Sequence, residues 1–141
     1  MKDLREFYAE ELASGWRRIG SYEDLINSFE HEIVLEFHDN AYLGDSRYIL
    51  RDGSRYGFLN FGWGSCSGCD ALAACETIEE VIELRDSLYN DIAWYDSAAG
   101  LLQFIKDRDW SLQYSWNNEG MRQFVKDATR MLEKIVSGEK S

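Results

Sequence analysis

Residues 46–61 of the chain read SRYILRDGSRYGFLNF, in which two apolar and aromatic runs flank Asp52-Gly53. An Asp-Gly pair between such runs is a strong signal for a β-hairpin, because glycine accepts the positive φ that a two-residue turn requires. With this pair as the loop, we expect Gly57 to lie opposite Tyr48, whose ring could cover the bare backbone. The two expected strands cover residues 46–51 and 54–61.

The segments on either side of this hairpin alternate between strand and helix periodicity. Before it, Ile33, Leu35 and Phe37 alternate with more polar positions, as in a strand with one buried face. After it, Thr77 is a capping residue at the start of an amphipathic helix. The expected strands are residues 33–38, 46–51, 54–61, 91–95 and 110–117, and the expected helices are residues 3–14, 22–29, 78–89, 98–108 and 118–136.

This order of elements predicts the fold class. The chain has 141 residues, of which 45% are hydrophobic, enough for one domain with a sizeable core. No repeat or flexible linker divides it, so we expect residues 1–141 to form a single α+β domain. Its sheet should be mainly antiparallel, with about five strands and with the helices chiefly on one face.

Charge restricts the partners of the chain. The sequence has 26 acidic and 15 basic side chains, a formal net charge of -11. Such a surface repels phosphate backbones, so we expect no direct binding of nucleic acid. The excess of acidic residues falls in residues 61–100, which contain eight acids and one base, Arg85. Residues 101–141 contain seven bases and six acids.

The acids of this region have two interpretations. They could be a solvated helix face, which keeps the protein soluble. They could also be a surface that imitates nucleic acid or binds a basic partner. In the second interpretation the candidate partner-binding acids are Glu76, Glu79, Glu80, Glu83 and Asp86.

Nothing in the sequence predicts a membrane segment. The longest apolar run, Ala71 to Cys75, is far too short to cross a bilayer. No apolar stretch follows Lys2, so we expect no cleaved signal peptide. Three cysteines are an odd number and do not suit a secreted disulfide framework. We therefore expect a cytoplasmic protein in a reducing compartment.

The cysteines leave three interpretations open. Cys66, Cys69 and Cys75, with His38 or His31 as a fourth ligand, could bind zinc, which favours sulfur and nitrogen. Cys66 and Cys69 could instead be a redox pair near a helix start, although the chain has no proline to match that of thioredoxin-like proteins. All three could simply fill a tight turn as small buried residues. We expect packing without a cofactor, with zinc or thiol chemistry as the alternative.

Other catalytic arrangements have little support. A hydrolytic triad would need Cys66 or a serine aligned with one of the two histidines, and no nucleophile elbow is present. Acids around the first strands could hold a divalent cation, although acids in turns usually form the turn itself. Those acids are Glu36, Asp39, Asp45 and Asp52.

Aromatic residues are abundant, with five tryptophans, eight tyrosines and seven phenylalanines. Most should be core, and Phe7 lies on the expected inner stripe of the first helix. An exposed remainder such as Tyr22, Tyr42 or Trp63 could anchor a partner, because tyrosine and tryptophan dominate binding hot spots.

Residues 64–70, GSCSGCD, resemble a run in small uncharacterised proteins of tailed bacteriophages, where it often follows a short hairpin. The similarity extends from the hairpin to the segment Trp110–Trp116. That group has no established activity, so the resemblance implies no mechanism. It implies a small phage protein that binds a host protein, for instance as an inhibitor of a defence system.

We therefore predict a non-enzymatic, acidic interaction protein of the host cytoplasm. Its partner would be a host protein with a basic surface, for instance one that handles nucleic acid. The alternative is a small zinc-binding or thiol-redox domain centred on Cys66, Cys69 and Cys75.

Overall fold

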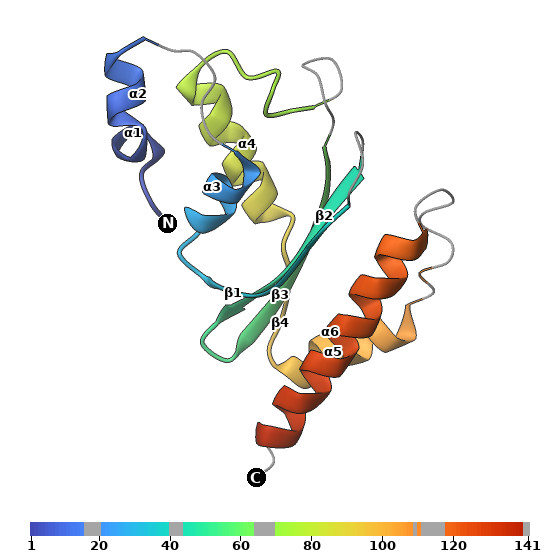
Figure 1. Ribbon diagram of the computed structural model, residues 1–141. Coiled ribbons are helices and arrows are strands. Elements are labelled where there is room, and N and C mark those ends of the chain that lie inside the picture. Colours follow the sequence, from blue (N-terminus) through green and yellow to red (C-terminus); the bar gives the residue numbers. More distant parts are fainter. Residues whose placement is uncertain (16–20, 40–43, 64–69, 109, 111–117, 140–141) are drawn as a thin grey trace.

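The computed structural model describes residues 1–15, 21–39, 44–63, 70–108, 110 and 118–139 (Figure 1). Within them, four strands form one antiparallel sheet in the order β1-β2-β3-β4, accompanied by helices, which confirms the predicted α+β class. The strands are β1 (Glu32–His38), β2 (Gly44–Asp52), β3 (Arg55–Trp63) and β4 (Ala93–Tyr95). The helices are α1 (Leu4–Phe7), α2 (Ala9–Ala13), α3 (Tyr22–Asn27), α4 (Ile78–Asn90), α5 (Ala98–Asp107) and α6 (Asn118–Glu139).

Helices cover both faces of this sheet (Figure 1). Tyr48 and Leu50 of β2 belong to a core shared with α1, α3 and α4, whereas Ile49 between them belongs to a second core shared with α5 and α6. The expectation that the helices lie chiefly on one face is therefore wrong. The physical reason is that neighbouring side chains of a strand point to opposite faces, and here both faces are apolar.

The β2–β3 hairpin forms as expected, but in a different register. Asp52 pairs with Arg55, so the loop is Gly53-Ser54, and Gly53 takes the positive φ of 63°. Gly57 consequently lies opposite Leu50 rather than Tyr48, and its partner on the other side is Trp94. Since the pairing has moved by two residues in total, every side chain keeps its expected face.

Strand β1 contains an irregularity that the alternation in the sequence does not reveal. Its register with β2 shifts between Ile33 and Leu35. Leu35 and Phe37 therefore pack on the α5–α6 side of the sheet, whereas Ile33 packs on the other side. The expected single inward face of Ile33, Leu35 and Phe37 is wrong at Ile33, because a bulge reverses the faces beyond it.

Two further elements differ from the expectations, and a third expected strand is not tested. The helix expected over residues 3–14 is divided at Tyr8 into α1 and α2. The strand expected over residues 91–95 shortens to β4, because Asp91 and Ile92 still bond the end of α4. The strand expected over residues 110–117 lies outside the described residues except for Trp110, whose indole donates to the carbonyl of Ile105. Among the described helices, none has the length and apolar character that a membrane span needs.

Candidate functional site

The five predicted partner-binding acids lie on the surface, four of them on helix α4 and Glu76 just before its cap. Thr77 caps the helix, accepting a hydrogen bond from the amide of Glu80 at 3.2 Å. Ile78, Val81 and Leu88 then bury the opposite stripe against the sheet. All five acids are exposed: Glu76, Glu79, Glu80, Glu83 and Asp86. The sequence therefore predicted their exposure correctly, since helical spacing separates them from the apolar stripe.

Two of these acids are paired with arginines. Glu79 lies 2.9 Å from Arg5 of α1, and this hydrogen bond is the main reason that the pKa of Glu79 is lowered. Asp86 lies 2.8 Å from Arg85, whose guanidinium also donates to the carbonyl of Lys2. Within the described part of the chain, Glu76, Glu80 and Glu83 form no ion pair. These three carboxylates are the ones available to a basic partner.

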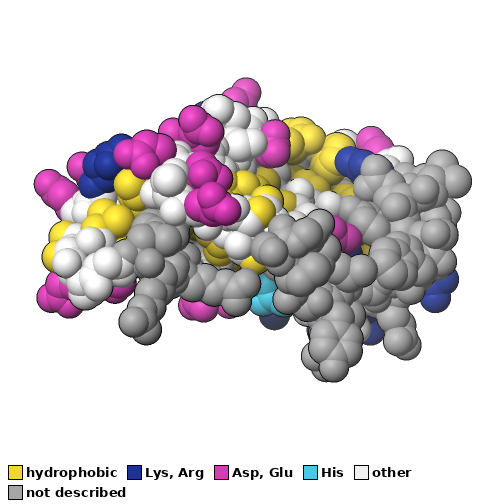
Figure 2. Space-filling view, turned by 90° about the horizontal axis from the view of Figure 1, so that it is seen from above, with side chains coloured by type: hydrophobic (Ala, Val, Ile, Leu, Met, Phe, Trp, Pro, Cys, Tyr) yellow, Lys and Arg dark blue, Asp and Glu magenta, His cyan; other side chains and the backbone are white. Residues whose placement is uncertain are grey.

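The charge of the molecule differs between the two sides of its sheet. The described residues of the α1–α4 side (1–15, 21–31 and 70–91), here called the acidic layer, carry 14 acidic side chains against three basic ones. The described side chains of the α5–α6 side (98–108 and 120–138) include three acidic and six basic ones. In Figure 2, carboxylates gather toward the left, where the acidic layer lies. Among the described helical residues, the excess of negative charge therefore lies on the α1–α4 side.

The aromatic ring of Phe7 is exposed within the acidic layer, although the sequence pattern predicted that it would be buried. Phe7 is 44% exposed and Met1 is 52% exposed, and these are the exposed large hydrophobic residues of the described chain. Phe7 was expected on the inner stripe of the first helix. It faces outward because the helix ends at this residue and restarts at Ala9, so that Leu4 and Tyr8 enter the core and Phe7 does not.

The predicted aromatic anchors occupy other places. The indole of Trp63 is half-buried and donates to Ser46 Oγ at 2.9 Å. Tyr22 is half-buried, and its hydroxyl donates to Asp70 at 2.9 Å. Tyr42 lies outside the described residues. Trp63 and Tyr22 are therefore engaged within the chain, and Phe7 is the better anchor candidate.

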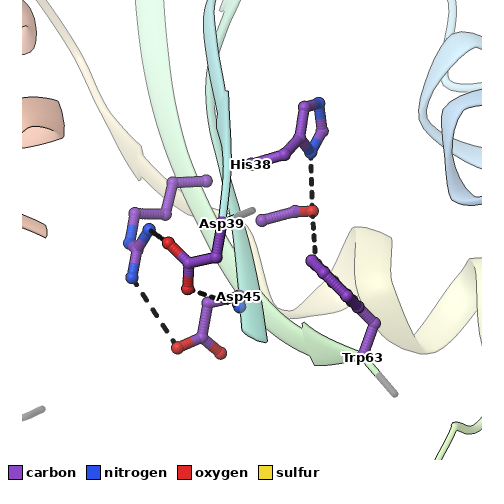
Figure 3. Close-up of polar contacts among 6 residues, drawn as sticks. His38, Asp39, Asp45 and Trp63 are labelled. Carbon is purple, nitrogen blue, oxygen red and sulfur yellow. Dashed lines mark hydrogen bonds and ion pairs between the residues drawn. The ribbon is translucent and has the colours of Figure 1, made fainter. Parts of the chain in front are cut away.

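His38 of β1 pairs across the sheet with Ser46 of β2. Nδ1 of His38 lies 2.7 Å from Ser46 Oγ (Figure 3). Its Nε2 lies 3.8 Å from the carboxylate of Glu36. Because an indole N–H only donates, Ser46 accepts from Trp63 and can direct its own proton to His38. Ser46 is buried, with 3% of its surface exposed, so this histidine–serine contact is a closed cross-strand bond and presents no open nucleophile.

On the other face of the same hairpin end, two of the candidate cation-binding acids hold an arginine instead. The guanidinium of Arg47 is fully buried and lies 2.9 Å from Asp39 and 3.7 Å from Asp45 (Figure 3). Asp39 also accepts the amide of Asp45 at 2.8 Å. Burial raises the pKa of Asp45, Arg47 lowers it and the neighbouring Asp39 raises it again. A signal for this cluster was present in the sequence, because an arginine within a strand that is buried on both faces requires a carboxylate partner.

The remaining candidate acids of that group lie apart. Asp52 forms an ion pair with Arg55 across the hairpin turn, and this bond lowers the pKa of Asp52. Glu36 is exposed on the side of the sheet that faces the acidic layer, away from Asp39 and Asp45. The described residues contain no group of three or more histidine, cysteine or acidic side chains placed to hold a metal ion.

Cys66 and Cys69 lie outside the described residues, so the structure places only Cys75. Its thiol is partly buried against the core of the acidic layer and lies 3.4 Å from the carbonyl of Ala71. Burial, followed by the charges of Glu80 and Asp70, raises the pKa of Cys75 above its ordinary value of 9.0. These surroundings suit a packed thiol better than a reactive thiolate at Cys75.

The fold defined by these contacts is a four-stranded antiparallel sheet between two helical layers of unequal charge. No family model, no curated protein and no solved structure matches this chain.

Proposed function

We propose that this chain is a non-enzymatic interaction protein that binds a basic partner through its acidic layer. The observation that supports this proposal best is the difference in charge between the described residues on the two sides of the sheet, with 14 acids against three bases in the acidic layer and no acidic excess on the α5–α6 side. An asymmetric field of this kind orients the molecule toward a basic surface before contact and accelerates association.

The contact surface would centre on α4 and α1. The Arg5–Glu79 ion pair joins the exposed sides of these two helices. It leaves the carboxylates of Glu80 and Glu83 available on α4 and the ring of Phe7 exposed on α1. An apolar anchor with a charged surround is the usual anatomy of a binding hot spot, because the anchor supplies burial and the charges supply specificity.

The resemblance of residues 64–70 to a run in tailed-bacteriophage proteins supports a host protein as the partner. A dense set of carboxylates can occupy a groove that normally holds phosphates, so a nucleic-acid-handling or defence protein fits the charge best. Inhibition would then be competitive, with nucleic acid and this chain excluding each other from one basic surface.

Capture from a host lysate on immobilised protein tests the proposal, with beads washed at low and at high salt. We expect a specific partner that is retained at low salt and lost at high salt, and that added nucleic acid displaces. The double variant E80K/E83K should lose the partner. D107K/E133K changes the net charge equally on the opposite side and should keep it. The absence of any specific partner at either salt, or equal loss in both variants, would contradict the proposal.

A further inference from the structure

Strand β1 is an edge of the sheet, and its outer backbone is unpaired within the described residues. The sheet order places β2 on one side of β1 and no described strand on the other. Its residues are partly or fully exposed, whereas residues 46–50 of β2 are all buried. Unpaired N–H and C=O groups along an apolar edge are a template for pairing with another strand.

The hydrogen-bond pattern identifies which groups point outward. The amide of Asp39 donates to the carbonyl of Asp45 at 3.1 Å, one step beyond the His38–Ser46 pair. In an antiparallel ladder such bonded pairs alternate with unbonded ones. The backbone groups of Phe37 and Leu35 therefore face β2, and those of Glu36 and His38 face the open edge.

The side chains of β1 differ between the two faces of the sheet. Leu35 and Phe37 lie on the α5–α6 side as partly exposed apolar residues. On the other side the Glu36 side chain is 49% exposed. Burial raises the pKa of Tyr48 on this side, and the negative charges of Glu36 and Glu23 raise it further, so both acids contribute to the same field.

We propose that β1 accepts an extended segment of the basic partner as an additional edge strand, with basic and aliphatic residues in alternation. The aliphatic side chains would lie beside Leu35 and Phe37, and the basic ones beside Glu36. This inference rests on the proposed function for the charge of the partner. A second copy of this chain suits the edge less well, because it would bring another Glu36 and a further net charge of -11.

Two variants separate the backbone of the edge from its charge. Glu36→Gln removes the carboxylate and keeps the backbone N–H of residue 36. Glu36→Pro removes both the carboxylate and this backbone N–H. Because the N–H points away from β2, the hydrogen bonds between β1 and β2 are kept. Thermal unfolding of each variant checks that the sheet is intact.

The probe is a short fluorescent peptide that alternates lysine and valine, and its binding is followed by anisotropy and amide hydrogen exchange. We expect binding to the wild type, an affinity in Glu36→Pro at least about fivefold below that in Glu36→Gln, and slowed exchange at Glu36 and His38. A peptide of the same composition with its lysines in one block should bind less tightly. N-methylation of alternate peptide amides should abolish binding, which tests the strand pairing without any change to the protein.

Equal binding of the alternating, blocked and N-methylated peptides would overturn the inference, as would protection on α4 instead of β1. Failure of the alternating peptide to bind would overturn it as well. None of these results touches the lysate capture and its E80K/E83K comparison, on which the proposed function is judged separately.

Discussion

The ring of Trp94 lies against the bare backbone of Gly57, its pairing partner across the β3–β4 ladder. A Cβ atom at position 57 would come within 2.9 Å of Cε3 of Trp94 and within 2.6 Å of Cγ2 of Ile92. Glycine is therefore required here by the close approach of the neighbouring strand, and this contact joins β4 and the end of α4 to the hairpin.

Substitution Gly57→Ala should destabilise the fold, because the added methyl group displaces Ile92 and Trp94 from a packed core. We expect a loss of about 1–3 kcal/mol in the free energy of unfolding, measured by urea denaturation. Gly138→Ala is the matched control, since nothing lies within 4 Å of its added Cβ. It should leave stability unchanged or slightly raised, and an equal loss in both variants would contradict the proposed packing.

Substitution Asp39→Ala should cost far more than the loss of a surface ion pair. It removes the nearer carboxylate, 2.9 Å from the fully buried Arg47, with Asp45 still 3.7 Å away, and breaking a buried ion pair costs about 3–5 kcal/mol. Asp52→Ala breaks the half-exposed pair with Arg55 and should cost far less, because solvent screens an exposed ion pair. Urea denaturation of the two variants checks the difference, and similar losses would show that Arg47 does not depend on Asp39.

Cys75 should react slowly with thiol reagents in the folded protein. Its pKa is raised, so it stays protonated at neutral pH. In the variant Cys66→Ser/Cys69→Ser, where Cys75 is the remaining thiol, labelling should be slow when folded and fast after unfolding. Because the folded pKa is higher than the unfolded one, the contribution of Cys75 to stability is present below pH 9.0 and is lost as the pH rises above it.

The intact chain should show neither a bound metal nor a reactive thiol pair. Elemental analysis of chelator-free protein should find no bound zinc, and thiol titration of the native wild type should find no fast-reacting pair. The zinc-binding or thiol-redox alternative predicts the opposite results. One zinc per chain would favour a metal site that includes Cys66 and Cys69. Fast thiols without metal would favour redox chemistry.

Several parts of the fold could be predicted from the sequence because their signals are local. The cap Thr77, the apolar stripe behind it and the exposed acids of α4 follow from helical spacing alone. The hairpin follows from Asp52-Gly53, although the choice between two adjacent turn positions depends on pairing along both whole strands.

The remaining features depend on contacts between distant segments. The apolar run Tyr48-Ile49-Leu50 indicates that β2 is buried on both faces. An alternating pattern in the other strands predicts one buried face only, so the second helical layer was not predicted. The bulge in β1 appears only in its pairing with β2, and the outward position of Phe7 follows from the break between α1 and α2. The buried Arg47 cluster likewise depends on the return of β2 beside the end of β1.

The proposed partner surface is tested most directly by the association rate of a captured partner, measured against ionic strength for the wild type, E80K/E83K and D107K/E133K. We predict that the wild-type rate falls as salt rises, that E80K/E83K associates more slowly with a flatter salt dependence, and that D107K/E133K follows the wild type. An unchanged rate in E80K/E83K, or an equal decrease in both variants, would contradict binding through the acidic layer.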